Sequence, residues 1–226
     1  MRPLIVVLLF GGAVACSSAA PPVAPDPTLV IPLTVGGDVR LSEHRLLLDV
    51  DLRRETLPDG WRVETGTWTP APDGLVGSID KKRAAVLWCD ASFPFDVAIR
   101  IEAEPLDGNT NDANAFFRAA GTIYGAGNQS AWIVGIAGWY VHDDGLERHP
   151  GGPAWRIKGE PLREGNVVEF VAGVRRDHVF LWKAGTLLLE RDDPAPLDPK
   201  THDRVGLGTW DSKIRFRRLR VYRIDG

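Results

Sequence analysis

Short runs of β-branched and aromatic residues recur along this chain, and Gly, Pro, Asn and Asp separate them. We read about fourteen such runs between Leu46 and Ile224, with no apolar repeat of helical period among them. Arg176-Asp177 and Ala184-Gly185 are typical of tight hairpin turns. Strands this short and this numerous bury a core by pairing into two packed antiparallel sheets. The pattern therefore predicts an all-β, two-sheet antiparallel sandwich.

The last two runs predict a hairpin whose second strand is irregular. Val205–Trp210 is followed by a turn at Asp211-Ser212 and by a strand over Ile214–Ile224. The apolar residues of this strand are Ile214 and Phe216 on one parity and Leu219 and Val221 on the other. Because side chains alternate between the two faces of a strand, the slip predicts a β-bulge between Arg217 and Arg218.

The same strand carries a run of basic side chains. We interpret the run as a solvated outer strand that protects a sheet edge. Its members are Lys213, Arg215, Arg217, Arg218, Arg220 and Arg223.

This closing hairpin resembles that of bacterial 3-keto-disaccharide hydrolase domains and related laminin-G-like modules. Further motifs extend the likeness: Leu57–Val63 with Trp68 and Asp73–Gly77 is similar to the family's opening meander, Phe93–Glu102 to a following strand, and Val168–Leu187 to the segment before the closing hairpin. The resemblance covers residues 46–224. It implies a jelly-roll sandwich of the concanavalin A-like lectin and glucanase type.

The resemblance also implies where an active site would lie. The family's catalytic-looking stretch corresponds to Asp112–Arg118, which keeps Arg118 but has Asp112 and Asn114 in place of Asn and Gly. The next strand of the family carries Glu and Gln, whereas Ser130–Val134 has neither. The Glu-x-Asp-x-x-Glu motif of jelly-roll glucanases is absent, and residues 113–142 contain no Asp or Glu. These departures favour binding over hydrolysis.

The N-terminus has the pattern of a bacterial lipoprotein. A basic start and a short apolar run precede Ala-Val-Ala-Cys, which resembles a lipobox ending at Cys16. A proline-rich segment follows, and a proline-rich chain is semi-extended. We therefore expect a signal peptide over residues 1–15, a lipidated Cys16 with a linker over 16–32, and one domain over 33–226. Ser17 after Cys16 favours the outer membrane of the bacterial cell envelope.

Composition limits the partners. The formal net charge is −3 at pH 7, which does not favour nucleic acid. Cys89 is the only cysteine besides Cys16, so the folded part has no internal disulfide available. The expected partners are a carbohydrate or other small polar ligand, and a membrane through the lipid anchor.

Candidate ligand-binding residues follow from strand parity. On the strand over Asp112–Arg118, the polar residues Asp112, Asn114 and Arg118 share one parity, so we expect them to face a groove. Trp139 and Trp155 adjoin polar loops and would supply flat walls for a sugar ring. The alternative for Arg118 is a structural ion pair with Glu102 or Glu104.

Two weaker sets complete the candidates. Glu102 and Glu104 lie two residues apart on one strand face and could act as catalytic carboxylates, although a solvated outer face explains them as well. The loop 142–149 carries His142, Asp144 and His149, which could hold zinc, or calcium through oxygen ligands. Its spacing fits no strong metal signature, and no cofactor is certain.

Three classes of function remain open at this point. The first is an envelope lipoprotein that binds a carbohydrate without cleaving it. The second is a 3-keto-disaccharide or other glycoside hydrolase, and the third is a scaffold for protein contacts. A fold hosts many functions, so only the site can decide among them.

Overall fold

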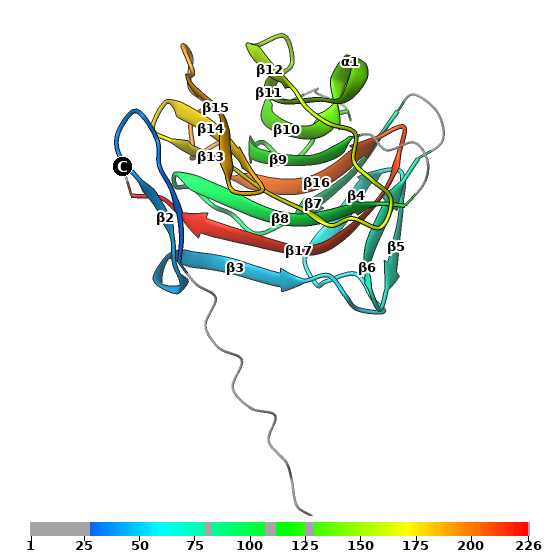
Figure 1. Ribbon diagram of the computed structural model, residues 1–226. Helices are drawn as coiled ribbons and strands as arrows, with labels where there is room; N and C mark the ends of the chain where they lie inside the picture. Colours follow the sequence, from blue (N-terminus) through cyan, green and yellow to red (C-terminus); the bar gives the residue numbers. More distant parts are fainter. Residues whose placement is uncertain (1–27, 80–82, 107–111, 125–128, 226) are drawn as a thin grey trace, which may run out of the picture.

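Two antiparallel sheets pack face to face in the computed structural model, which describes residues 28–79, 83–106, 112–124 and 129–225 (Figure 1). The seven-stranded sheet has the order β12 (Ala154–Lys158), β11 (Asp143–His149), β10 (Ala131–Gly138), β9 (Ala113–Ala119), β16 (Arg204–Trp210), β7 (Ala84–Cys89) and β4 (Trp61–Thr65). The eight-stranded sheet has the order β15 (Thr186–Asp192), β14 (His178–Lys183), β13 (Val168–Arg175), β8 (Val97–Pro105), β17 (Lys213–Arg223), β6 (Gly74–Ser78) and β5 (Thr67–Ala71), and β3 (Leu46–Asp51) pairs with β17. The predicted all-β jelly-roll sandwich is confirmed.

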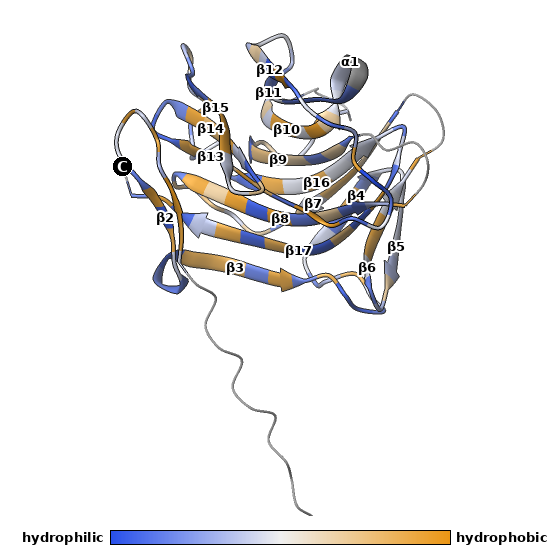
Figure 2. Cartoon of the chain, in the orientation of Figure 1, coloured by the Kyte–Doolittle hydropathy of each residue, from blue (hydrophilic) through white to orange (hydrophobic). Residues whose placement is uncertain are grey.

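The core lies between the sheets, and strand alternation builds it. On β7, Ala85, Leu87 and Cys89 face this core, while Val86 and Trp88 face the other way. Bands of apolar and polar residues alternate along β8 and β17 in the same manner (Figure 2). Each sheet therefore has an inner face in the core and an outer face that can be polar or covered.

An N-terminal hairpin covers part of the outer face of the eight-stranded sheet. Its elements are β1 (Leu29–Ile31), β2 (Val39–Leu41) and the short 3₁₀ helix η1 (Glu43–Arg45). Ile31 is fully buried in a cluster with Phe180 and Trp182 of β14. β1 falls inside the segment 16–32 that we expected to be a linker, so the folded chain starts earlier than residue 33. Cys16 and the signal peptide lie outside the described residues.

β17 confirms the predicted bulge and corrects its predicted environment. Phe216 pairs with Ala103 and Arg218 with Glu102, so Arg217 is the extra residue. The strand is central, between β8 and β6, and not at an edge as the basic run suggested. Neighbouring carboxylates neutralise the run: Glu104 pairs with Arg215 and Arg217, and Asp49 with Arg218 and Arg220.

The only α-helix in the described part of the chain is α1 (Trp139–His142), a single turn between β10 and β11. Figure 1 shows it at the top of the molecule, beside the ends of these strands. Across the described residues, no helix has the length and apolarity needed to cross a bilayer.

Candidate functional site on the outer face of the seven-stranded sheet

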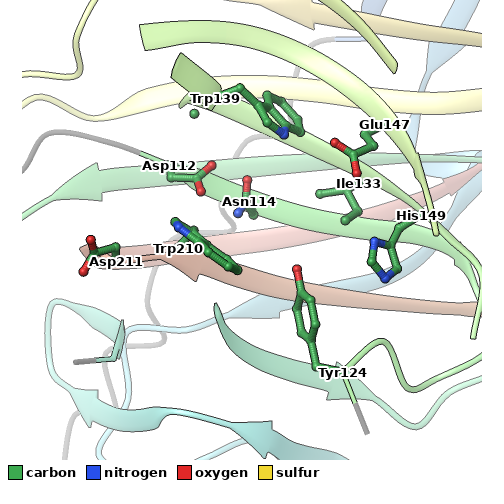
Figure 3. Close-up of a pocket in the computed structure, with 10 residues that line it drawn as sticks. Asp112, Asn114, Tyr124, Ile133, Trp139, Glu147, His149, Trp210 and Asp211 are labelled. Carbon is green, nitrogen blue, oxygen red and sulfur yellow. The ribbon is translucent and has the colours of Figure 1, made fainter. Parts of the chain in front are cut away.

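A cavity of about 550 Å³ opens on the outer face of the seven-stranded sheet. That volume lies within the range of small-molecule sites. Figure 3 shows the side chains of Trp139 and Trp210 on opposite sides, with Asp112 and Asn114 between them. The lining residues are Asp112, Asn114, Tyr124, Ile133, Gly138, Trp139, Glu147, His149, Trp210 and Asp211. We call this cavity the aromatic pocket.

The alternation of β9 carries Asp112 and Asn114 into the pocket. Ala113 and Ala115 face the core, so the residues of the other parity face outward. Asn114 lies opposite Gly135 of β10 and Gly208 of β16. Because neither neighbour has a side chain, the rings of Trp139 and Phe116 can lie over these two glycines, beside Asn114.

Glycines shape the walls around these two residues. A Cβ at Gly135 would lie 2.7 Å from Cζ3 of Trp139, and one at Gly145 would lie 3.3 Å from the same atom. A Cβ at Gly138 would come within 2.5 Å of an Asp112 carboxylate oxygen. The indole of Trp139 and the carboxylate of Asp112 therefore reach their positions because the sequence has glycine at these places.

Burial changes the ionisation of Asp112. Its desolvation is the largest effect, a hydrogen bond from Asn114 opposes it, and the charge of Glu147 adds to it, so the pKa of Asp112 rises to about 7. No Lys or Arg of the described residues is ion-paired with this carboxylate. Asp112 is therefore a carboxyl group that changes its charge near neutral pH inside a cavity.

The side chain of Asn114 carries a buried hydrogen-bond acceptor. Asn114 is 8% exposed, and its Oδ1 has no hydrogen-bond partner within the described part of the chain. A buried acceptor without a donor is costly, and native proteins seldom leave one without a function or a bound molecule.

Tyr124 forms one wall of the pocket. Its ring centroid lies 5.7 Å from that of His149 and 6.5 Å from that of Trp210. Desolvation raises the pKa of its hydroxyl to about 12, although 41% of the residue surface is exposed. The neighbouring acidic groups act in the same direction, so the hydroxyl stays protonated and can donate.

Glu64 of β4 holds the segment that presents Tyr124. Its carboxylate accepts hydrogen bonds from the backbone amides of Ile123 and Tyr124, the Thr122 hydroxyl and the indole N–H of Trp88. Burial alone would raise the pKa of Glu64, but these donors outweigh it and lower the pKa. The segment also closes over a second apolar cluster, in which Trp88 and Phe116 are buried on the outer face.

Glu147 and His149 complete the pocket from β11. Both lie on the outward parity of the strand, and Glu147 pairs with Arg156 of β12 at 3.6 Å. Burial lowers the pKa of His149, so its ring is neutral at pH 7. The guanidinium of Arg156 also lies 5.2 Å from the Trp139 ring centroid.

Among the ligand-binding candidates, Asp112, Asn114 and Trp139 line the pocket, whereas Arg118 does not, which corrects the parity argument. Phe116 pairs with Gly206 and Ala119 with Arg204, so β9 has one extra residue and a bulge at Arg118, with φ of 47°. The bulge turns Arg118 away from the outer face. Its guanidinium is buried and ion-paired with Asp96, neither with Glu102 nor with Glu104.

Trp155 also lies elsewhere. It is opposite Leu146, whose side chain is in the core, and it stacks on Trp132 with ring centroids 5.4 Å apart. The ring therefore covers the core beneath β11 and β12, on the face opposite to the aromatic pocket. The polar loop beside Trp155 did not indicate which face its side chain takes, because the parity of β12 depends on the register in which it pairs with β11.

The three metal candidates are not brought together. Asp144 and His149 have opposite parity on β11, so Asp144 points between the sheets, where it binds Lys183 at 2.7 Å and accepts the Ala137 amide. His142 belongs to α1. No three His, Cys, Asp or Glu side chains of the described ranges are grouped to hold a metal ion.

The two catalytic candidates lie on a different sheet. Glu102 and Glu104 belong to β8 of the eight-stranded sheet, whose alternate residues Ile101 and Ala103 face the core. They therefore point to the outer face of the eight-stranded sheet, on the side of the sandwich away from the aromatic pocket. Glu104 forms ion pairs with Arg215 and Arg217. Neither can act in the pocket. The sequence analysis did not identify Tyr124 as a site residue. Its position depends on Glu64, which lies 60 residues earlier in the chain and accepts a hydrogen bond from the Tyr124 backbone amide.

No family model matches this chain, and no curated protein matches it. Solved structures do. Carbohydrate-binding module CBM66 from Bacillus subtilis matches at 17% identity with a TM-score of 0.56, covering 72% of this chain and 95% of that one. A galectin-like protein of unknown function from the same species matches at 18% identity with a TM-score of 0.64, covering 80% and 96%. A laminarinase from Flavobacterium sp. UMI-01 matches at 11% identity with a TM-score of 0.58, covering 79% and 100%.

These similarities establish the fold. The chain has the galectin-like, concanavalin A-like jelly-roll fold that occurs in carbohydrate-binding modules and in glucanases.

Proposed function

We propose that the protein binds a carbohydrate in the aromatic pocket. The single observation that carries the proposal is the arrangement of Trp139, Trp210 and Tyr124 around the unsatisfied Oδ1 of Asn114. Indole and phenol faces pack on the C–H faces of a sugar ring, while a buried acceptor selects a hydroxyl or amine. A pocket with apolar walls and a few convergent polar groups is the usual form of such a site.

Structural relatives support the same class of ligand. One of them is named as a carbohydrate-binding module and another as a laminarinase. At this level of identity they support the fold directly and the ligand class only by analogy.

A glycan panel tests the proposal. The domain over residues 28–226 is incubated with oligosaccharides of different sugar units, binding is measured, and the same samples are analysed for cleavage products. We expect one group of glycans to bind without being cleaved. Trp139→Ala should weaken that binding by at least about tenfold, as the loss of an aromatic hot spot does.

The matched control is Trp61→Ala. Trp61 is half-buried against the core on β4 and lies outside the pocket. Its replacement should leave glycan affinity unchanged. Equal loss in both variants would show general unfolding, and retention of binding in Trp139→Ala would contradict the proposed site.

A second candidate, glycoside hydrolysis, has one observation in its favour. Asp112, with a pKa of about 7, and Glu147 lie in the same pocket, and a pair of carboxyl groups can act as acid and base. A 3-keto-disaccharide would be the substrate by the sequence resemblance. Released product that depends on both carboxyls would favour this candidate over binding alone.

We also propose that Cys16 anchors the protein to the bacterial envelope by a lipid. The support is the sequence of residues 1–32 alone: a short signal, the Ala-Val-Ala-Cys motif and a proline-rich segment. The sandwich would then stand off the membrane and present its pocket to soluble glycans.

A further inference from the structure

The floor of the aromatic pocket consists of hydrogen-bond acceptors. Asp112 is 9% exposed and Asn114 is 8% exposed, and both line the cavity. The side-chain amide of Asn114 donates a hydrogen bond to Asp112. The Oδ1 of Asn114 is buried and has no partner among the described residues. A ligand group seated here must therefore donate hydrogen bonds.

The charges of the lining are of one sign. Asp112, Glu147 and Asp211 are acidic, and the described residues that line the pocket include neither Lys nor Arg. The ring of His149 is neutral at pH 7 because burial lowers its pKa. Arg156 pairs with Glu147 and lies over Trp139, so it offsets the charge of Glu147.

The walls suit a cation as well as a sugar ring. Trp139, Trp210 and Tyr124 present three aromatic rings to one cavity (Figure 3). Aromatic faces attract an ammonium group, and the attraction grows when the group is desolvated.

We propose that the ligand presents a protonated amino group to Asp112 and to the Oδ1 of Asn114, so that the pocket prefers an amino sugar over neutral and acidic sugars. An ammonium group supplies three donors and no acceptor, which suits the floor. Its charge also compensates a buried carboxylate that has no cationic partner among the described residues. This inference rests on the proposed carbohydrate-binding function and names the class of sugar.

Matched sets of oligosaccharides test it. Each set has one linkage and one ring configuration and differs only in one substituent: an amino group, a hydroxyl, an N-acetyl group or, in the acidic member, a carboxylate. Binding is measured by calorimetry at about pH 7, below the usual pKa of an α-amino group. Within the set that binds, the amino member should bind at least about tenfold more tightly than the others, as a charge-assisted hydrogen bond predicts.

Asp112→Asn assigns the preference to its residue. The change keeps the shape and removes the charge, so the ratio of affinities for the amino and hydroxyl members should fall to near one. Glu147→Gln is the second variant, and it should reduce the same ratio by a smaller factor because Arg156 already offsets Glu147. Asp38→Asn, at an exposed aspartate of the N-terminal hairpin, removes the same charge away from the pocket and should keep the ratio.

The outcomes separate this inference from the proposed function. If a neutral or acidic sugar binds as well as its amino counterpart, and Trp139→Ala abolishes that binding, the inference is wrong and the proposed function stands. If the preference for the amino member survives in Asp112→Asn, the charge assignment is wrong. If no oligosaccharide of any set binds, both proposals are contradicted.

Discussion

At the scale of single residues, glycine decides where the functional side chains of this protein lie. The sequence places Gly135, Gly138 and Gly145 next to the residues that build the pocket. A Cβ at Gly135 or Gly138 would clash with a pocket residue, and one at Gly145 would crowd the Trp139 ring. Sequence parity correctly predicted that Asp112 and Asn114 share the outward face of their strand. It was wrong for Arg118, because a bulge shifts the parity between Phe116 and Ala119 and no local signal marks it.

Gly135→Ala should therefore reduce both ligand affinity and stability. The new Cβ would lie 2.7 Å from the Trp139 ring and 2.8 Å from Oδ1 of Asn114, so both must move. We expect glycan affinity to fall by about tenfold, and overpacking to cost about 1–3 kcal/mol of folding free energy. Calorimetric titration together with chemical denaturation measures both. Wild-type affinity in this variant would show that the positions of Trp139 and Asn114 are unimportant.

At the scale of elements, long-range hydrogen bonds fix the segments that sequence reasoning missed. The hairpin turns at Arg176-Asp177 and Ala184-Gly185 and the bulge in β17 were predictable, because each is encoded within a few residues. The N-terminal hairpin and the Tyr124 wall were not predictable, since a carboxylate far along the chain holds each of them. Glu64 holds the wall, and Glu190 holds the hairpin.

Glu64→Gln should loosen the Tyr124 wall. The variant replaces a carboxylate that accepts hydrogen bonds from four groups by an amide with one acceptor oxygen, and it places N–H groups against backbone N–H groups. We expect a loss of about 1–3 kcal/mol in the free energy of unfolding. Glycan affinity should fall several-fold as the wall loses its position. Glu160→Gln, at an exposed glutamate, is the control and should change neither quantity.

The N-terminal hairpin should detach in acid. Burial alone would raise the pKa of Glu190, but donors from Thr34, Val35 and His178 outweigh it and lower the pKa to about 2. A lowered pKa gives stabilisation that is fully present above the ordinary value of 4.5 and is lost as the pH falls through about 2. The amides of Thr34 and Val35 should accordingly lose protection against hydrogen exchange between these two pH values.

Protection factors, which correct for the pH dependence of intrinsic exchange, measure this detachment. Glu190→Gln should show the low protection already at neutral pH. Amides of β9 serve as an internal reference, because they lie in the other sheet. Equal loss of protection in β9 and at Thr34 would show global unfolding and not release of the hairpin.

At the scale of the whole molecule, the two outer faces of the sandwich differ in kind. The outer face of the eight-stranded sheet is covered by the N-terminal hairpin and by ion pairs such as Glu104 with Arg217. The outer face of the seven-stranded sheet has an open pocket in which the Oδ1 of Asn114 has no partner among the described residues. The fold was predictable because strand alternation determines it, whereas the metal and carboxylate candidates failed because sequence proximity does not bring side chains to the same face.

Anchoring is the prediction that belongs to the full chain. Cys16→Ala in cells should release the protein into soluble fractions or stall its processing, because acyl chains supply the membrane affinity. Cell fractionation and the mass of the N-terminal peptide measure the result. Identical partitioning of wild type and variant, without a lipid on the peptide, would contradict the lipoprotein proposal.

The most direct test of the central claim is a titration of the folded domain with a bound glycan, followed through the indole N–H signals of its tryptophans in NMR spectra. The signals are assigned by single Trp→Phe substitutions. We predict that the glycan shifts the signals of Trp139 and Trp210 and leaves that of Trp68, which is buried between the sheets, in place. Saturable shifts confined to tryptophans outside the pocket, with Trp139 and Trp210 unmoved, would contradict the account.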